Sequence, residues 1–148
     1  MSTVLVAFGR AAVGRWNSTV AAQYHLTIRP QEFGYKTAVR WVALTNADGI
    51  GLIAAGLPLL GTATNPYRSE EIEGPRGKGQ LRSIDLPAQT VVSWNLDLGQ
   101  MGVGGDTSWG ARTHPEYTLP ARPYRYSFRL QPFSAREVSP ATLARQLR

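Results

Sequence analysis

Apolar and polar residues alternate along much of the chain with a period of two. The side chains of a β-strand point to opposite faces in turn, so this alternation predicts strands with one buried and one wet face. The pattern is less regular over 39–44 and 50–55, but the turn residues between these segments predict a hairpin. The strands predicted in this way cover residues 24–28, 39–44, 50–55, 92–98 and 124–130.

Proline and glycine separate the predicted strands, and a single helical signal follows them. Glycine or proline recurs over 74–79, and three prolines lie in the link between the last two strands, so we expect loops there. Ser139 fits an N-cap and Pro140 the first helical position, while Leu143 and Leu147 share a face. The sequence therefore predicts an all-β fold, a partial antiparallel β-sandwich with a short C-terminal helix.

Composition excludes several classes of protein. The 148 residues suit one domain or a part of a larger one. Without cysteine the chain has no disulfide framework and no thiolate nucleophile or metal ligand. No apolar run approaches the roughly 20 residues of a membrane-spanning helix, and 43% hydrophobic residues is too high for a disordered chain. The first apolar run precedes its arginines, unlike a secretory signal, so we expect a cytoplasmic protein.

Basic residues give the chain a net charge of +6, and 14 of the 16 are arginine. A strongly basic balance can indicate a nucleic-acid or membrane partner. The charges are scattered, however, and no block of five or six occurs. We therefore interpret them as solvated surface and expect neither nucleic acid nor membrane as a partner.

The familiar catalytic and metal-binding patterns are weak here. The glycines of 101–106 are not followed by Gly-Lys-Ser or Gly-Lys-Thr and precede a loop, so they do not form a phosphate-binding motif. His25 and His114 lie far apart, which argues against a metal site. Ser108, His114 and Asp106 form a triad on paper, but no nucleophile-elbow motif supports it. We expect no catalytic residue, metal or cofactor on this chain.

Trp109 differs from the other three tryptophans. Trp16, Trp41 and Trp94 fit a core, whereas Trp109 lies in the polar, glycine-rich stretch 104–110 outside any alternating pattern. A flat apolar ring on such a loop suits stacking against the face of a sugar. The same residue also suits a plug that folds down on the sandwich. Physical reasoning alone leaves both interpretations open.

Two segments carry a resemblance to a known family. Residues 102–110 read Gly-Val-Gly-Gly-Asp-Thr-Ser-Trp-Gly, within a longer similar segment that covers 95–130. Residues 29–41 read Arg-Pro-Gln-Glu-Phe-Gly-Tyr-Lys-Thr-Ala-Val-Arg-Trp. Together with 44–49 and 65–73, and in the same order, they closely resemble the C-terminal end of the large bacterial β-galactosidases of glycoside hydrolase family 2.

The resemblance implies a piece of the last, small-chain domain of these enzymes. In the family this domain is a galactose-mutarotase-like β-sandwich that packs against a (β/α)₈ barrel, and the barrel carries both catalytic glutamates. The family's tryptophan in this motif helps to hold the sugar, so the resemblance gives that role to Trp109. The substrate-binding residues expected on this chain are Trp109, Asp106, Ser108 and His114, with Gly104 and Gly105 presenting the loop.

The chain also departs from the family pattern. Ala38 stands where the family usually has an acid, and a histidine expected near 77–85 is replaced. We assign 23–133 to the sandwich, 1–22 to an unassigned segment and 134–148 to a tail. The chain is shorter than the family's full last domain, so a truncated gene product is one interpretation. Missing strands would leave exposed edges that can pair with another chain, including a second copy in an oligomer.

These observations lead to one functional prediction and two alternatives. The chain is expected to complete the active site for hydrolysis of terminal β-D-galactosides, with the sugar and a β-galactosidase catalytic chain as its partners. The first alternative is a stand-alone carbohydrate-binding module. The second is a vestigial fragment without a ligand.

Overall fold

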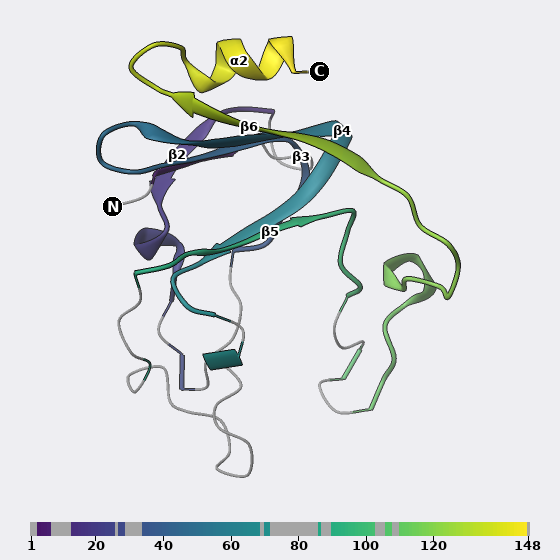
Figure 1. The fold of residues 1–148 in the computed structure, drawn as a ribbon. Coiled ribbons are helices and arrows are strands. Elements are labelled where there is room, and N and C mark those ends of the chain that lie inside the picture. The colour runs from purple at the N-terminus through teal and green to yellow at the C-terminus, as the bar shows by residue number, and fades with distance from the viewer. Residues whose placement is uncertain are drawn as a thin grey trace.

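An antiparallel sheet of six strands forms the body of the protein. The computed structural model describes residues 3–6, 13–25, 27–28, 34–68, 70–71, 86, 90–102, 106–107 and 110–147 (Figure 1). The strands are β1 (Thr3–Val6), β2 (Trp16–Thr19), β3 (Lys36–Thr45), β4 (Ile50–Asn65), β5 (Ser93–Asp97) and β6 (Ser127–Ser134). Two 3₁₀ turns, η1 (Ala21–Gln23) and η3 (Pro115–Tyr117), and the helix α2 (Pro140–Gln146) complete the elements. This bears out the predicted all-β class with a short C-terminal helix.

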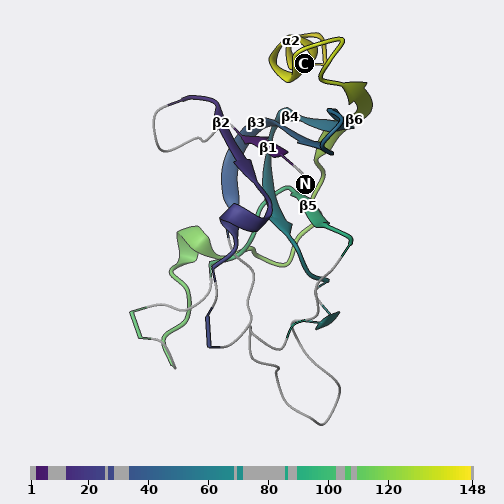
Figure 2. The same cartoon turned by 90° about the vertical axis from the view of Figure 1, so that its left-hand side faces the viewer.

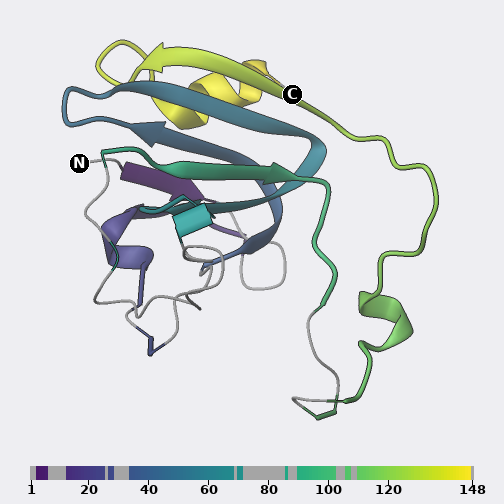
Figure 3. The ribbon, with the colours of Figure 1, turned by 60° about the horizontal axis from the view of Figure 1, so that its bottom comes forward.

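The long strand β4 joins the two halves of the sheet. The strand order is β2-β1-β3-β4-β5, and β6 also pairs with β4. The first half of β4, 50–57, pairs with β6, and its second half, 61–65, pairs with β5. A bend between these halves turns β5 away from β6, as Figure 3 shows. One strand can therefore border three others.

Two irregularities in the pairing of β3 with β4 accompany this bend. The register runs from Trp41 opposite Ala55 to Val39 opposite Leu60, so β4 carries extra residues there. A second shift lies between Val39 and Lys36, on the β3 side. Ala38 lies within this second bulge and adopts a positive φ of 54°. β-bulges bend strands and increase their twist, which is what the curved sheet requires.

The hairpin predicted between 39–44 and 50–55 is confirmed. The side-chain Oδ1 of Asn46 accepts hydrogen bonds from the backbone N–H groups of Asp48 and Ile50, both at 3.0 Å. Gly49 takes a φ of 80°, a conformation that favours glycine. Leu44 then faces Leu52 across the hairpin, so turn chemistry and strand pattern agree.

Two apolar clusters lie on opposite faces of the sheet. On one face α2 covers the β4–β6 region (Figures 1 and 2). Its Leu143 and Ala144, and Leu147 directly after it, belong to one cluster with Ile53. Ser139 Oγ accepts a hydrogen bond from Thr142 N at 3.1 Å, which confirms the predicted N-cap. The second cluster fills the inside of the bend, from the residues Val20, Val39, Val42, Ala54 and Leu60, with Leu44, Trp94 and Leu96 against it.

Part of the second face carries apolar side chains that the described residues leave exposed. Ile50, Leu52, Phe128 and Leu130, which we call the open face, are 60%, 39%, 36% and 51% exposed. The pairing registers place all four on the same side of the sheet as buried Ala54. Ile50 and Leu52, together with Val92 and Trp94, line a shallow pocket of about 280 Å³. Contiguous exposed apolar surface of this kind typically marks an interaction site.

Several strand predictions need correction. Tyr24, His25, Thr27 and Ile28 are not in a strand, although their alternation predicted one. The Tyr24 ring instead contacts Tyr67 edge-on, with ring centroids 5.0 Å apart. Packing against a distant residue, and not a strand face, therefore accounts for the aromatic side chain at position 24.

The last strand and the N-terminal segment also differ from the prediction. The strand predicted over 124–130 begins only at Ser127, because Tyr124 turns back to donate a hydrogen bond to the Pro120 carbonyl at 2.7 Å. Sequence patterns predicted neither β1 nor β2, and Trp16, expected in a core, is 38% exposed. In the part of the chain that the structure describes, no helix is long and apolar enough to cross a membrane.

Replacing Ala38 with glycine should stabilise the fold. An L-residue is strained at a φ of 54°, whereas glycine is not, so Ala38→Gly should raise the free energy of unfolding by about 0.5–1 kcal/mol. Ala47 in the hairpin turn has no positive φ, and Ala47→Gly should lower that free energy by about 0.4–1 kcal/mol. Urea unfolding followed by circular dichroism measures both. Equal destabilisation by the two variants would contradict the assignment of strain to Ala38.

Candidate functional site

The loop between β5 and β6 holds the residues that the sequence nominates for substrate binding. It leaves the sheet after Asp97, projects away from it and returns at β6, as Figures 1 and 3 show. Two hydrogen bonds join its outgoing and returning arms near η3. Gly102 N donates to the Tyr117 carbonyl at 2.8 Å, and Thr113 Oγ1 donates to the Gly102 carbonyl at 2.8 Å. The arms are therefore held together at a distance from the sheet.

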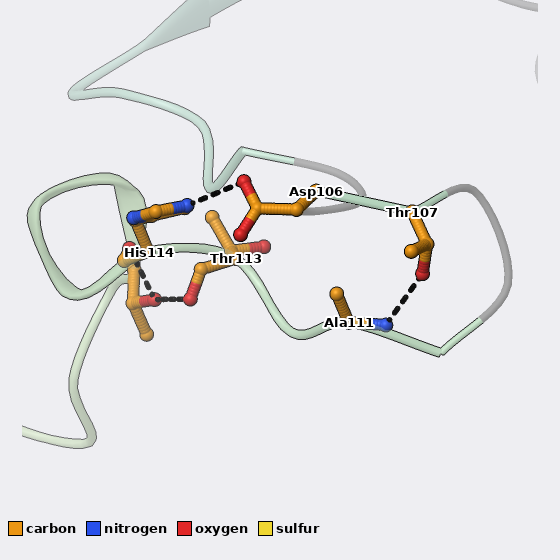
Figure 4. Close-up of polar contacts among 6 residues, drawn as sticks. Asp106, Thr107, Ala111, Thr113 and His114 are labelled. Atoms are coloured by element: carbon orange, nitrogen blue, oxygen red, sulfur yellow. Dashed lines mark hydrogen bonds and ion pairs between the residues drawn. The ribbon is translucent and has the colours of Figure 1, made fainter.

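Asp106 and His114 meet at the outer part of this loop (Figure 4). His114 Nε2 and Asp106 Oδ1 lie 3.0 Å apart, with the two side chains 51% and 83% exposed. Thr107 Oγ1 accepts a hydrogen bond from Ala111 N at 3.1 Å, and Thr118 Oγ1 donates one to the His114 carbonyl at 3.1 Å. Polar contacts between side chains this exposed add little stability, so this contact positions side chains rather than holding the fold together.

The structure thus brings together two of the predicted substrate-binding residues. Asp106 and His114 are in contact, eight residues apart in sequence. Trp109, Ser108, Gly104 and Gly105 lie outside the described residues, and their predicted roles remain predictions. Among the side chains that the structure describes, no group of three or more histidines or carboxylates is placed to hold a metal ion.

A second polar group lies at the base of the loop, on the sheet. Tyr35 packs its hydroxyl over Gly61, where a Cβ atom would come within 1.9 Å of the Tyr35 Oη. Gly61 faces Asp97, the last residue of β5, across the ladder. On the returning arm, Tyr126 Oη donates a hydrogen bond to the Leu96 carbonyl at 2.7 Å. The Tyr126 hydrogen bond therefore ties the returning arm to the end of β5, where Asp97 lies.

Burial changes the pKa values of Tyr35 and Asp97 at the foot of the loop. Burial first, and the neighbouring Asp97 carboxylate second, raise the pKa of Tyr35 to about 12. Burial also raises the pKa of Asp97, and the neighbouring Tyr35 hydroxyl opposes this shift only in part. Asp97 Oδ2 is buried without a hydrogen-bond partner that the described residues supply. The charged carboxylate is therefore less favourable here than in water.

The outer part of the loop presents exposed hydrogen-bonding groups. An exposed carboxylate beside an imidazole offers acceptors and a donor for hydroxyl groups. Their 3.0 Å contact shows that the loop can place such groups together. Sequence reasoning missed Tyr35, Asp97 and Tyr126. The one available signal was the place of Asp97 between the apolar positions of the β5 strand, directly before the loop.

Comparison with known proteins gives consistent matches. A family model described as the β-galactosidase small chain matches residues 10–130. A β-galactosidase of Priestia megaterium is 44% identical over 106 residues, which cover 71% of this chain and 10% of that protein. A β-galactosidase of Vibrio vulnificus is 46% identical over 124 residues, covering 84% and 11%, respectively. The β-galactosidase BgaC of Bifidobacterium adolescentis is 33% identical over 114 residues, covering 75% and 10%. The chain therefore spans about a tenth of the length of these relatives.

Replacing Asp97 with asparagine should stabilise the protein at neutral pH. The raised pKa of Asp97 means that the folded state disfavours its charge, so Asp97→Asn should raise the thermal midpoint at pH 7. The advantage should shrink as the pH falls towards 4, because the wild-type carboxyl then becomes neutral in the folded state. Differential scanning fluorimetry between pH 4 and 8 measures this.

Asp48→Asn provides the matched control for that titration. Asp48 contacts Arg136 at 3.4 Å with both side chains at least 70% exposed, so its loss should leave the midpoint nearly unchanged. A lower midpoint for Asp97→Asn at pH 7 would contradict the assignment of an unfavourable buried charge to Asp97.

Proposed function

Because this chain belongs to the β-galactosidase small-chain family, we propose that it completes the active site of a β-galactosidase whose catalytic glutamates lie on another chain. The observation that carries the proposal is the family match over residues 10–130, which includes the whole β5–β6 loop. The relatives are about ten times longer than the matched region. In this proposal the missing catalytic machinery belongs to a partner.

The open face supports the need for a partner. Its four apolar side chains, Ile50, Leu52, Phe128 and Leu130, are between 36% and 60% exposed. Burying apolar surface is favourable by roughly 25 cal/mol per Å². A partner chain that covers this face would therefore bind with a favourable free energy from burial. We assign this face to contact with the β-galactosidase partner. A second copy of the chain is the competing occupant.

The reaction served would be retaining hydrolysis of terminal β-D-galactosides. Two carboxyl groups do this chemistry, one as acid and base and the other as nucleophile. The proposal gives this chain a binding role. Trp109 would stack on the sugar or its leaving group, and Asp106 and His114 would form hydrogen bonds with hydroxyl groups. Binding contacts of this kind orient the substrate for attack.

Reconstitution tests the proposal directly. The partner is the Priestia megaterium β-galactosidase shortened by the region that this chain matches. Hydrolysis of a chromogenic β-galactoside is measured for each component alone and for the mixture. Activity that appears only in the mixture is the expected result. No activity in the mixture, with the purified chain folded, would overturn the proposal.

A titration of the chain alone with a β-galactoside distinguishes the two alternatives, a stand-alone carbohydrate-binding module and a vestigial fragment. A change in tryptophan fluorescence without a partner would indicate a stand-alone carbohydrate-binding module. A chain with no binding and no reconstitution would indicate a vestigial fragment. The proposal expects weak or no sugar binding until the partner is present.

Trp109→Ala should weaken substrate binding in the reconstituted enzyme by about 1–3 kcal/mol, the size of a buried aromatic contact. The Michaelis constant and turnover number of the mixture measure this loss. Trp109→Phe is the matched control, because it keeps a flat ring and should retain most of the affinity. Unchanged affinity and turnover in Trp109→Ala would exclude the stacking role.

A further inference from the structure

A groove between α2 and the β2–β3 side of the sheet collects three arginines. Arg15 lies directly before β2, Arg40 lies on β3 and Arg145 lies in the last turn of α2. All three line one pocket of about 250 Å³, beside the ring of Trp41. Arg145 lies more than 100 residues from the other two in sequence, so the fold itself brings the charges together.

The described residues do not balance these charges. No ion pair joins Arg15, Arg40 or Arg145 to a carboxylate within the part of the chain that the structure describes. A cation in the last turn of a helix is favoured by the helix dipole, which accounts for Arg145. It accounts for neither Arg15 nor Arg40. All three arginines are exposed. Three guanidinium groups that line one surface pocket repel one another and give it a positive potential.

The guanidinium groups favour a phosphate over a single carboxylate. Each offers a planar fork of N–H donors that matches two oxygens of an oxyanion. A phosphate monoester presents three terminal oxygens and up to two negative charges, whereas a carboxylate presents two oxygens and one charge. A cluster of three arginines is therefore better matched by the phosphate.

A second compartment adjoins the first and has different chemistry. It has a volume of about 190 Å³ and shares Arg15, Trp41 and Ala141 with the arginine pocket. Trp16, 38% exposed, and Pro140 supply much of its remaining lining. An indole ring at this position offers a flat apolar surface to the uncharged part of a ligand. α2 contributes to both compartments and lies beyond the family match, which ends at residue 130.

We propose that this groove binds a small organic phosphate, with the phosphate group held by Arg15, Arg40 and Arg145 and a ring-shaped remainder against Trp16. The site has a charged half and an apolar half. A phosphate ester of a ring compound satisfies both, and a sugar phosphate, whose ring has an apolar face, is one such molecule. The proposal does not depend on the β-galactosidase role of the chain.

Calorimetric titration of the full chain at low ionic strength tests the proposal. The probes are glucose 6-phosphate, inorganic phosphate and glucose. Glucose 6-phosphate should bind more tightly than inorganic phosphate, and glucose should not bind measurably. Arg40→Gln and Arg145→Gln should each weaken glucose 6-phosphate binding by about 10- to 100-fold, the effect of losing a charge-assisted hydrogen bond.

Arg125→Gln is the matched control, because it removes the same charge from an exposed position outside the groove. It should change the affinity less than about twofold, since distant exposed charges are screened. Arg40→Lys keeps the charge but loses the fork, and should fall between wild type and Arg40→Gln. Thermal midpoints without ligand establish that each variant is folded.

Three results would overturn the proposal. The first is no binding of glucose 6-phosphate by the folded wild-type chain. The second is an equal loss of affinity in Arg40→Gln, Arg145→Gln and Arg125→Gln, which would indicate non-specific attraction to a basic protein. The third is equal affinity for inorganic phosphate and glucose 6-phosphate with no effect of Trp16→Ala, which would indicate an adventitious ion only.

Discussion

The pairing of β4 on both of its edges and along both of its halves is the constraint on which the rest of the structure depends. Its first half pairs with β3 and β6, and its second half pairs with β5. Ile53 and Ala55 face the cluster under α2, while Ala54 and Leu60 face the cluster inside the bend. Both cores are therefore built on one strand. β5 pairs with the part of β4 beyond the bend, and the β5–β6 loop leaves the sheet from the end of β5.

Local chemistry predicted the elements whose causes are local. The hairpin around Asn46 and Gly49 follows from turn residues that act within five positions, and α2 follows from the cap at Ser139. The bend in β4 and the bulge at Ala38 depend on pairing between distant segments, so no periodicity shows them. The incorrect strand at Tyr24 has the same origin, because the contact with Tyr67 decides its conformation.

The sequence predicted residues of the candidate site only where they belong to a specific motif. Resemblance in the glycine-rich string, and not physical pattern, nominated Asp106, and the structure places its carboxylate 3.0 Å from His114. The buried group of Tyr35 and Asp97 depends on Gly61 admitting the tyrosine ring, which sequence spacing cannot show. The arginine groove assembles segments from both ends of the chain and was invisible for the same reason. The protein is thus a β-sheet domain of the β-galactosidase small-chain family, with one exposed apolar face and a β5–β6 loop that projects from the sheet.

Cysteine labelling can show whether a partner covers the open face. The chain has no cysteine, so Leu130→Cys on the open face and Arg129→Cys on the opposite face of β6 each introduce one reactive thiol. The rate of maleimide labelling is measured with and without the shortened β-galactosidase. We expect the partner to slow the labelling of Leu130→Cys and to leave the labelling rate of Arg129→Cys unchanged. An unchanged rate at Leu130→Cys, or equal slowing at both positions, would contradict this expectation.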